Sequence, residues 1–153
     1  MSPEGWSDVA ASLRQSGLRV TAPRVAVLSE LRAGQHLTAD QVAAGVRDRA
    51  GPISTQAVYD VLAAFTRAGL LRRIEPAGSA TRYETRVGDN HHHVVCRGCG
   101  AIADVDCVVG EPPCLEPPDA NGFVVDEAEI TFWGLCPTCQ TQTAAPEPEM
   151  KES

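Results

Sequence analysis

The chain has 153 residues, enough for one domain or two small ones, and its hydrophobic fraction of 43% is ordinary for a globular protein. A net charge of −7 argues against a chain that binds nucleic acid over its whole surface. Met1 to Val20 contain no apolar run suited to a signal peptide or membrane anchor, and no later segment could span a bilayer. We therefore expect a cytoplasmic protein with reduced thiols.

The charge is unevenly divided along the chain. Residues 1–86 carry 11 Arg and 8 acidic residues, whereas residues 87–153 carry 2 basic residues, 12 acidic residues and every Cys. This asymmetry predicts two domains with different partners, at 1–86 and 91–142, joined by a hinge at 87–90 where Gly and Asn permit a bend. The Pro- and Glu-rich end, 143–153, is expected to be disordered.

Three helices are predicted after a short first helix at 7–15. Thr21 caps a helix that carries Pro early and ends at Gly34. Residues 38–41 form a Thr-Ala-Asp-Gln capping box, which starts a helix that runs to about residue 49. Ser54 caps the last one, Thr55 to Ala68, whose apolar positions 58, 61, 62 and 65 lie on one face.

Two short strands follow, at 70–75 and 81–84, around a Gly turn, and predict a β-hairpin. Helices joined by short turns and followed by a hairpin are typical of a winged helix, with Ser54–Ala68 as the recognition helix. Its exposed N-terminal side chains could meet base edges: Ser54, Thr55, Gln56 and Tyr59. Phosphate contacts are expected from Arg19, Arg24, Arg72, Arg73 and Arg82. Taken singly, each of these residues is equally compatible with an ordinary solvated surface position.

Two Cys-x-x-Cys pairs lie in the acidic half, Cys96/Cys99 and Cys136/Cys139, separated by 36 residues. Two such pairs complete a tetrahedral Cys₄ shell, the arrangement of a structural zinc. Two disulfides are the alternative, although disulfides are rare in reducing compartments. Because four thiolates close the shell, the three histidines at 91–93 need another role, and a second metal is the natural candidate.

Cys107 and Cys114 remain outside this set. Four prolines surround Cys114, so a loop with at most a short helix is expected there. The two thiols are either packed and idle or a second redox element. Residues 127–132 alternate like a half-buried strand that leads into the second Cys pair.

These motifs together resemble the ferric uptake regulator (Fur) family, and the match runs in order over roughly residues 10 to 140. The chain is most similar to its actinobacterial FurA/CatR branch, which is similar to the peroxide-sensing PerR repressors. The segments that carry the resemblance are Gly17–Arg24, Ser54–Tyr59, Gly69–Leu71, Arg82–Glu84, Val87–His93 and the Cys107/Cys114 pair.

The resemblance implies an α+β fold, with an N-terminal winged helix-turn-helix followed by a small α/β dimerisation domain that holds the Cys₄ zinc. It implies a homodimeric repressor of double-stranded operator DNA, with no membrane and no small-molecule substrate. The regulatory Fe²⁺ or Mn²⁺ would be held by His36, Glu84, His91, His93 and Asp104. A metal bound by both halves would fix the angle between the domains. Some members have an additional metal site, which we do not predict because Asn90, His92 and Ala128 replace its ligands; we expect His92 to face elsewhere.

The resemblance further implies peroxide as the signal: bound Fe²⁺ would react with it, a ligand histidine would be oxidised, and oxidative-stress genes such as catalase would be released. Iron-level sensing on the same fold is the alternative. An enzyme, either a zinc hydrolase or a dithiol oxidoreductase, is the alternative from another class. The hydrolase lacks a His-Glu-x-x-His helix, and the oxidoreductase lacks a βαβ context for its Cys-x-x-Cys.

Overall fold

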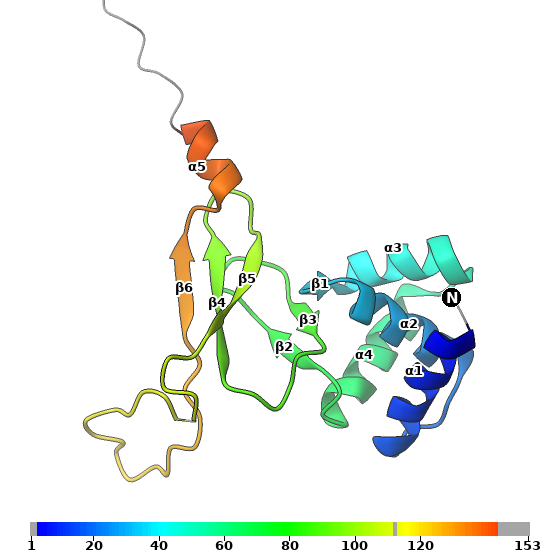
Figure 1. Cartoon of the computed structure of the whole chain (residues 1–153), viewed down its shortest axis with the longest axis horizontal. Coiled ribbons are helices and arrows are strands. Elements are labelled where there is room, and N and C mark those ends of the chain that lie inside the picture. Colours follow the sequence, from blue (N-terminus) through cyan, green and yellow to red (C-terminus); the bar gives the residue numbers. More distant parts are fainter. Residues whose placement is uncertain (1–2, 112, 144–153) are drawn as a thin grey trace, which may run out of the picture. The chain divides into compact units, whose positions relative to one another are not determined.

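A computed structural model describes residues 3–111 and 113–143 of the chain. The protein divides into two compact units, Met1–Asp89 and Asn90–Ser153 (Figure 1). The division falls inside 87–90, the segment where the sequence predicts a hinge. Each unit has a three-stranded sheet of its own, so the two are described in turn.

The first unit contains four helices, α1 (Pro3–Gln15), α2 (Ala22–Ala33), α3 (Ala39–Ala50) and α4 (Thr55–Arg67). Three begin at the predicted caps. The Thr21 hydroxyl accepts from the Arg24 N–H at 3.5 Å, and the Ser54 hydroxyl accepts from the Ala57 N–H at 3.1 Å. Both hydrogen bonds of the predicted capping box are present before α3. Only α1 differs, since it begins four residues before the predicted start.

The apolar faces of these helices form one core. Leu28 of α2, Val42 of α3 and the α4 residues Leu62 and Phe65 are at most 1% exposed. Burying a side chain of this size contributes about 1.5–3 kcal/mol relative to leaving it in water. The core therefore fixes α4 with its opposite face, including Tyr59, turned outward.

The sheet of the first unit has the order β1-β3-β2, with β1 at Leu37–Thr38, β2 at Arg72–Ile74 and β3 at Arg82–Glu84. The antiparallel β2–β3 pair confirms the predicted hairpin, in shorter form. The two-residue strand β1 has no counterpart in the sequence analysis. Its pairing of Leu37 with Tyr83 brings the residue before it, His36, beside the end of β3.

The second unit has the sheet order β5-β4-β6, with β4 at His91–Cys96, β5 at Ile102–Asp106 and β6 at Thr131–Gly134, followed by α5 at Pro137–Thr143. β4 pairs antiparallel with β5 and parallel with β6 (Figure 1). The strand expected at 127–132 is wrong at its start, because the pairing with β4 begins only at Thr131. The expected disordered end is also wrong at Thr143, which closes α5; residues 144–153 lie outside the described residues.

Residues 107–130 connect β5 to β6. Their described part contains no helix or strand, in agreement with the loop that the prolines predict. Several of its apolar side chains are exposed, among them Val108, Phe123 and Val124. Within the described ranges, no helix is long and apolar enough to cross a membrane.

The second unit buries little apolar surface. Among its described residues, the buried apolar side chains are Val95 and Cys96, whereas the three histidines of β4 are all at most 4% exposed. So small a core cannot stabilise a domain by itself. The unit therefore depends on further cross-links, for which its Cys and His side chains are the available groups.

Candidate metal centres and nucleic-acid interface

The four thiols of the two Cys-x-x-Cys pairs converge at one end of the second sheet. Cys96 ends β4, Cys139 lies in α5, and one sulfur atom from each of the four lies within 4.8 Å of the others. The Sγ atoms of Cys99 and Cys136 are 3.7 Å apart, too far for a disulfide and close to the spacing of two thiolates on one tetrahedral zinc. All six cysteines of the chain are free thiols, so the structure does not support the disulfide alternative.

Backbone groups prepare this cluster for a cation. The Cys136 N–H donates to the Cys96 sulfur at 3.2 Å and, together with the backbone N–H groups of Cys99 and Gly98, lowers the pKa of that thiol to about 6. Proton sharing with Cys136 and the other sulfurs raises the pKa of Cys139 to about 12. A Cβ atom at Gly98 would lie 2.9 Å from the Cys139 sulfur, so this turn has no space for a side chain at position 98 beside the thiols. The donor set and this cradle both fit zinc, which would be held by Cys96, Cys99, Cys136 and Cys139.

A buried acid–base pair lies in the first unit. His36 Nε2 and Glu84 Oε2 are 3.1 Å apart, and both side chains are at most 5% exposed. His36 has a φ of +55°, an uncommon conformation for a residue with a side chain and one often found at functional sites. The β1–β3 pairing creates this contact between residues 48 positions apart. We call His36 and Glu84 the N-terminal half-site.

A second group lies in the second unit. His91 and His93 project from the same face of β4, and their rings meet edge to face with centroids 4.9 Å apart. Asp104 stands opposite His93 on β5, with its Oδ1 3.9 Å from His91 Nε2 and 3.6 Å from His93 Nε2. These three residues form the C-terminal half-site. Imidazole nitrogens and a carboxylate suit Fe²⁺, Mn²⁺ or Zn²⁺.

His92 points the other way, as expected, because neighbouring residues of a strand face opposite sides. Its Nε2 lies 3.1 Å from the Cys114 sulfur, and Cys107 completes a group within 4.8 Å. The structure thus brings the two leftover thiols together with a histidine. Strand alternation along 91–93 was the signal in the sequence that could have indicated this.

The start of α4 exposes the side chains expected to read DNA. Thr55, Gln56 and Tyr59 are all exposed, and Tyr59 keeps 45% of its surface open. Some of their polar atoms already have partners, since Arg47 Nη2 donates to the Thr55 hydroxyl at 3.1 Å and Gln56 Nε2 donates to Asp60 at 2.9 Å. Arg47 was not predicted. It also donates to the Ile53 carbonyl at 3.0 Å and so ties α3 to the start of α4.

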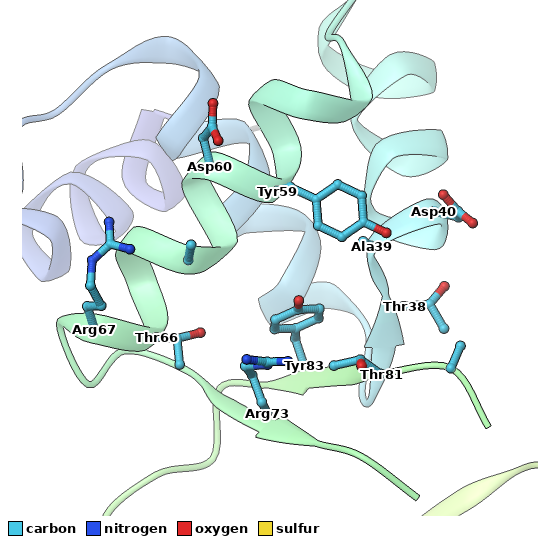
Figure 2. A pocket seen from close by; sticks show the side chains of 12 residues that line it. Thr38, Ala39, Asp40, Tyr59, Asp60, Thr66, Arg67, Arg73, Thr81 and Tyr83 are labelled. Atoms are coloured by element: carbon cyan, nitrogen blue, oxygen red, sulfur yellow. The ribbon is translucent and has the colours of Figure 1, made fainter. Parts of the chain in front are cut away.

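A hollow of about 580 Å³ lies between α4 and the hairpin strands (Figure 2). Tyr59 extends into it from α4, and Arg73 and Tyr83 line it from the strands. The hollow combines apolar and polar surface, with carboxylates at Asp40 and Asp60 as well as cations at Arg67 and Arg73. Arg67 was not among the predicted contacts. This arrangement sets a wing and a recognition helix around one concave surface.

The predicted phosphate contacts differ in their surroundings. Arg19 and Arg73 are exposed, although the Arg73 guanidinium also pairs with Glu75. Arg24 is half-buried and donates to the Arg19 carbonyl at 3.0 Å. Arg82 donates to the His36 carbonyl at 3.2 Å, so it supports the backbone of the N-terminal half-site.

A winged-helix unit followed by a Cys- and His-rich metal-binding unit is the architecture of metal-dependent DNA-binding proteins, and comparison with known proteins narrows the class. The ferric uptake regulator family model matches residues 15–132, and the chain belongs to this family. It is 59% identical to the transcriptional regulator FurA of Mycobacterium tuberculosis. The alignment of 132 residues covers 86% of this chain and 90% of that protein. It is 55% identical to ferric uptake regulation protein 1 of Mycolicibacterium fortuitum, over 87% of this chain and 83% of that protein.

Solved structures agree on the fold. The ferric uptake regulator of Vibrio cholerae superposes with a TM-score of 0.65 at 23% identity, covering 83% of this chain and 98% of that chain. The α+β fold class predicted from the sequence is therefore confirmed.

Proposed function

We propose that this protein is a metal-dependent transcriptional repressor that binds operator DNA as a homodimer and releases it in response to peroxide. The observation that carries the proposal is the pair of half-sites. Each offers nitrogen and oxygen donors, all of them buried except the partly exposed Asp104, and they lie in the two units that flank residues 87–90. The proteins named as its relatives are transcriptional and ferric uptake regulators, which supports a regulator rather than an enzyme.

The proposed regulatory ion is held jointly by His36 and Glu84 from one unit and by His91, His93 and Asp104 from the other. Fe²⁺ or Mn²⁺ commonly takes six donors, and the five side chains of the two half-sites together come much closer to this number than either half-site alone. Such binding would favour one orientation of the DNA-binding unit over others. Because the ion would bind the protein most tightly in that orientation, its presence would shift the protein toward that conformation.

DNA recognition is assigned to the surface around the start of α4. In this proposal Tyr59 and Gln56 meet base edges in the major groove, while Arg19, Arg24 and Arg73 neutralise phosphates. The net positive charge of residues 1–86 supports this role, whereas the acidic second half would be repelled by DNA.

Dimerisation is assigned to the second unit. β6 exposes Phe132 by 47% and Trp133 by 36%, and Leu135 beyond it by 42%, and a monomer would leave these apolar side chains in water. Two copies would bury these side chains against each other and supplement the small core. A dimer would also present two recognition helices to an operator with two half-sites.

Peroxide sensing is assigned to the imidazoles of the regulatory site. Bound Fe²⁺ would supply the redox chemistry with peroxide, which Mn²⁺ does not readily do. His36, His91 and His93 are the nearest oxidisable groups, and a ring that gains one oxygen atom, as peroxide is reduced to water, becomes a poorer donor. Loss of a donor weakens metal binding and, by linkage, DNA binding. Iron-level sensing is the second candidate, in which release follows iron loss with no change to any histidine.

The test compares two metal forms of the zinc-loaded full chain. An operator is first selected from random DNA with the Mn²⁺ form, and affinity is then measured by fluorescence anisotropy before and after peroxide. The Fe²⁺ form should lose its affinity, with one added oxygen found on His36 or His91 by peptide mass analysis, while the Mn²⁺ form keeps its affinity. Equal release in both forms that tracks oxidation of Cys107 or Cys114 would contradict histidine sensing.

A matched pair of variants tests the regulatory site. Glu84→Gln removes one carboxylate of the N-terminal half-site and should abolish Mn²⁺-dependent DNA binding. Asp48→Asn removes an exposed carboxylate from α3 and should leave that binding unchanged. Iron-level sensing would show itself as Fe²⁺-dependent binding that chelators reverse and peroxide does not.

A further inference from the structure

The group formed by His92, Cys107 and Cys114 belongs to neither metal centre described above. His92 is 4% exposed and lies on the face of β4 opposite His91 and His93. It pairs with Val105 of β5, and Cys107, which directly follows that strand, lies within 4.8 Å of His92 by their ligand atoms. After the turn at Gly110, where φ is +79°, the chain returns and places Cys114 against the same imidazole.

The distances suit a shared ion. One nitrogen and two sulfur atoms lie within 4.8 Å of one another, and His92 Nε2 is 3.1 Å from the Cys114 sulfur. Donors on a tetrahedral zinc are about 3.6 Å (N to S) and about 3.8 Å (S to S) apart, as follows from metal–ligand bonds of about 2.0–2.3 Å. A shift of about half an ångström at Cys114 reaches that spacing.

We propose that His92, Cys107 and Cys114 form a third metal site, which binds a thiophilic ion of the Zn²⁺ class. Two thiolates and an imidazole are soft to borderline donors and favour such an ion over Fe²⁺ or Mn²⁺. Three protein ligands leave a fourth position for water or another small ligand. It shares the position of His92 with the additional site of the family resemblance but has a different donor set, because Ala128 offers no donor and both thiols come from the connection after β5.

The connection itself supports a cross-link at this point. The described part of residues 107–130 is long for a loop without secondary structure, and such loops are commonly functional. Val108 and Val109 of the Cys107–Cys114 turn are 101% and 60% exposed, so the turn is not held by burying its own aliphatic side chains. An ion on Cys107, Cys114 and His92 would fasten the turn to the central strand of the sheet and add order that the small core lacks.

Cobalt distinguishes this site from the other two. The full-length chain is reduced, loaded with Zn²⁺ in the Cys₄ cluster and then titrated with Co²⁺ under argon. The half-sites contain no sulfur, so a thiolate-to-cobalt absorption band reports Cys107 and Cys114. The band should saturate at about one Co²⁺ per chain and should be displaced by added Zn²⁺.

Three variants make the assignment specific. The double variant Cys107→Ser/Cys114→Ser should lose the band while it keeps its Cys₄ zinc and its circular dichroism. His92→Ala should weaken Co²⁺ binding about tenfold or more. Glu111→Gln, an exposed position in the same turn, should bind like the parent. Absence of the band in the reduced parent, its survival in the double variant, or full affinity in His92→Ala would each overturn the proposal.

Discussion

At the scale of single residues, Tyr59 offers the sharpest test of DNA recognition, because it is exposed and lines a hollow together with Arg73, a proposed phosphate contact. Tyr59→Ala should reduce discrimination between operator and random DNA by about 1–3 kcal/mol, the value of one base contact. Arg73→Ala should instead weaken binding to both DNAs alike and lower the salt dependence. Competition anisotropy at two salt concentrations measures both effects, and equal losses on both DNAs for Tyr59→Ala would remove it as a base reader.

A substitution at Gly98 tests whether the tight turn between Cys96 and Cys99 helps to hold zinc. An alanine methyl there would lie 2.9 Å from the Cys139 sulfur and 3.2 Å from its Cβ, so the turn must open. Gly98→Ala should therefore release zinc to a chelator about tenfold faster than the parent. Gly134→Ala is the matched control, since a Cβ atom at Gly134 meets nothing within 4 Å. Identical release rates in the two variants would show that the turn does not constrain the thiols.

At the scale of elements, the capping box before α3 connects a local sequence signal with stability. Thr38→Ala removes the acceptor of the Gln41 N–H and should lower the free energy of unfolding by about 1 kcal/mol. Urea unfolding of the zinc-loaded chain, followed by helical circular dichroism, measures the change. Gln15→Ala, at an exposed helix end, is the control and should change the free energy of unfolding by less than about 0.5 kcal/mol. A Thr38→Ala effect no larger than that of the control would count against the cap.

The elements also show what the sequence could predict. α2, α3 and α4 were predictable because caps and apolar spacing are local signals. β1 and α5 were missed, since two residues carry no periodicity and α5 has no buried side chain to give one. No strand was assigned to β4, because histidines have no strand preference and its ladder with β5 and β6 is a tertiary property.

The metal sites also differ in how far the sequence alone could predict them. The Cys₄ cluster follows from spacing alone, and the histidines at 91–93 stand out as candidates for a second metal without any resemblance, whereas His36, Glu84 and Asp104 came only from the family resemblance. The contact of His36 with Glu84 depends on the β1–β3 pairing across 48 positions, which no local pattern reveals. The meeting of His92 with Cys107 and Cys114 was missed for a similar reason, because it needs both strand alternation and the return of the chain after β5.

At the scale of the whole molecule, the small apolar core of the second unit makes zinc a structural requirement. Cys96→Ser or Cys136→Ser should lose the Cys₄ zinc and dimerisation together, because metal binding and folding are one equilibrium in such a unit. Metal analysis and light scattering measure the two properties, and the helical signal of the first unit should persist. Thr138→Ala, within the same Cys-x-x-Cys turn, removes no thiol and should remain dimeric. A zinc-free variant that still dimerises would contradict this dependence.

Strand β4 has one further consequence for how this protein can vary. Within six residues it carries His91 and His93 on one face, His92 on the other, and Cys96 at its end. A single inserted or deleted residue would exchange the two faces and displace the first thiolate by about 3.3 Å. This strand is therefore expected to tolerate no change of length. The part of the connection that follows Cys114, residues 115–130, carries none of the proposed metal ligands, so a tag or reporter would best be grafted there.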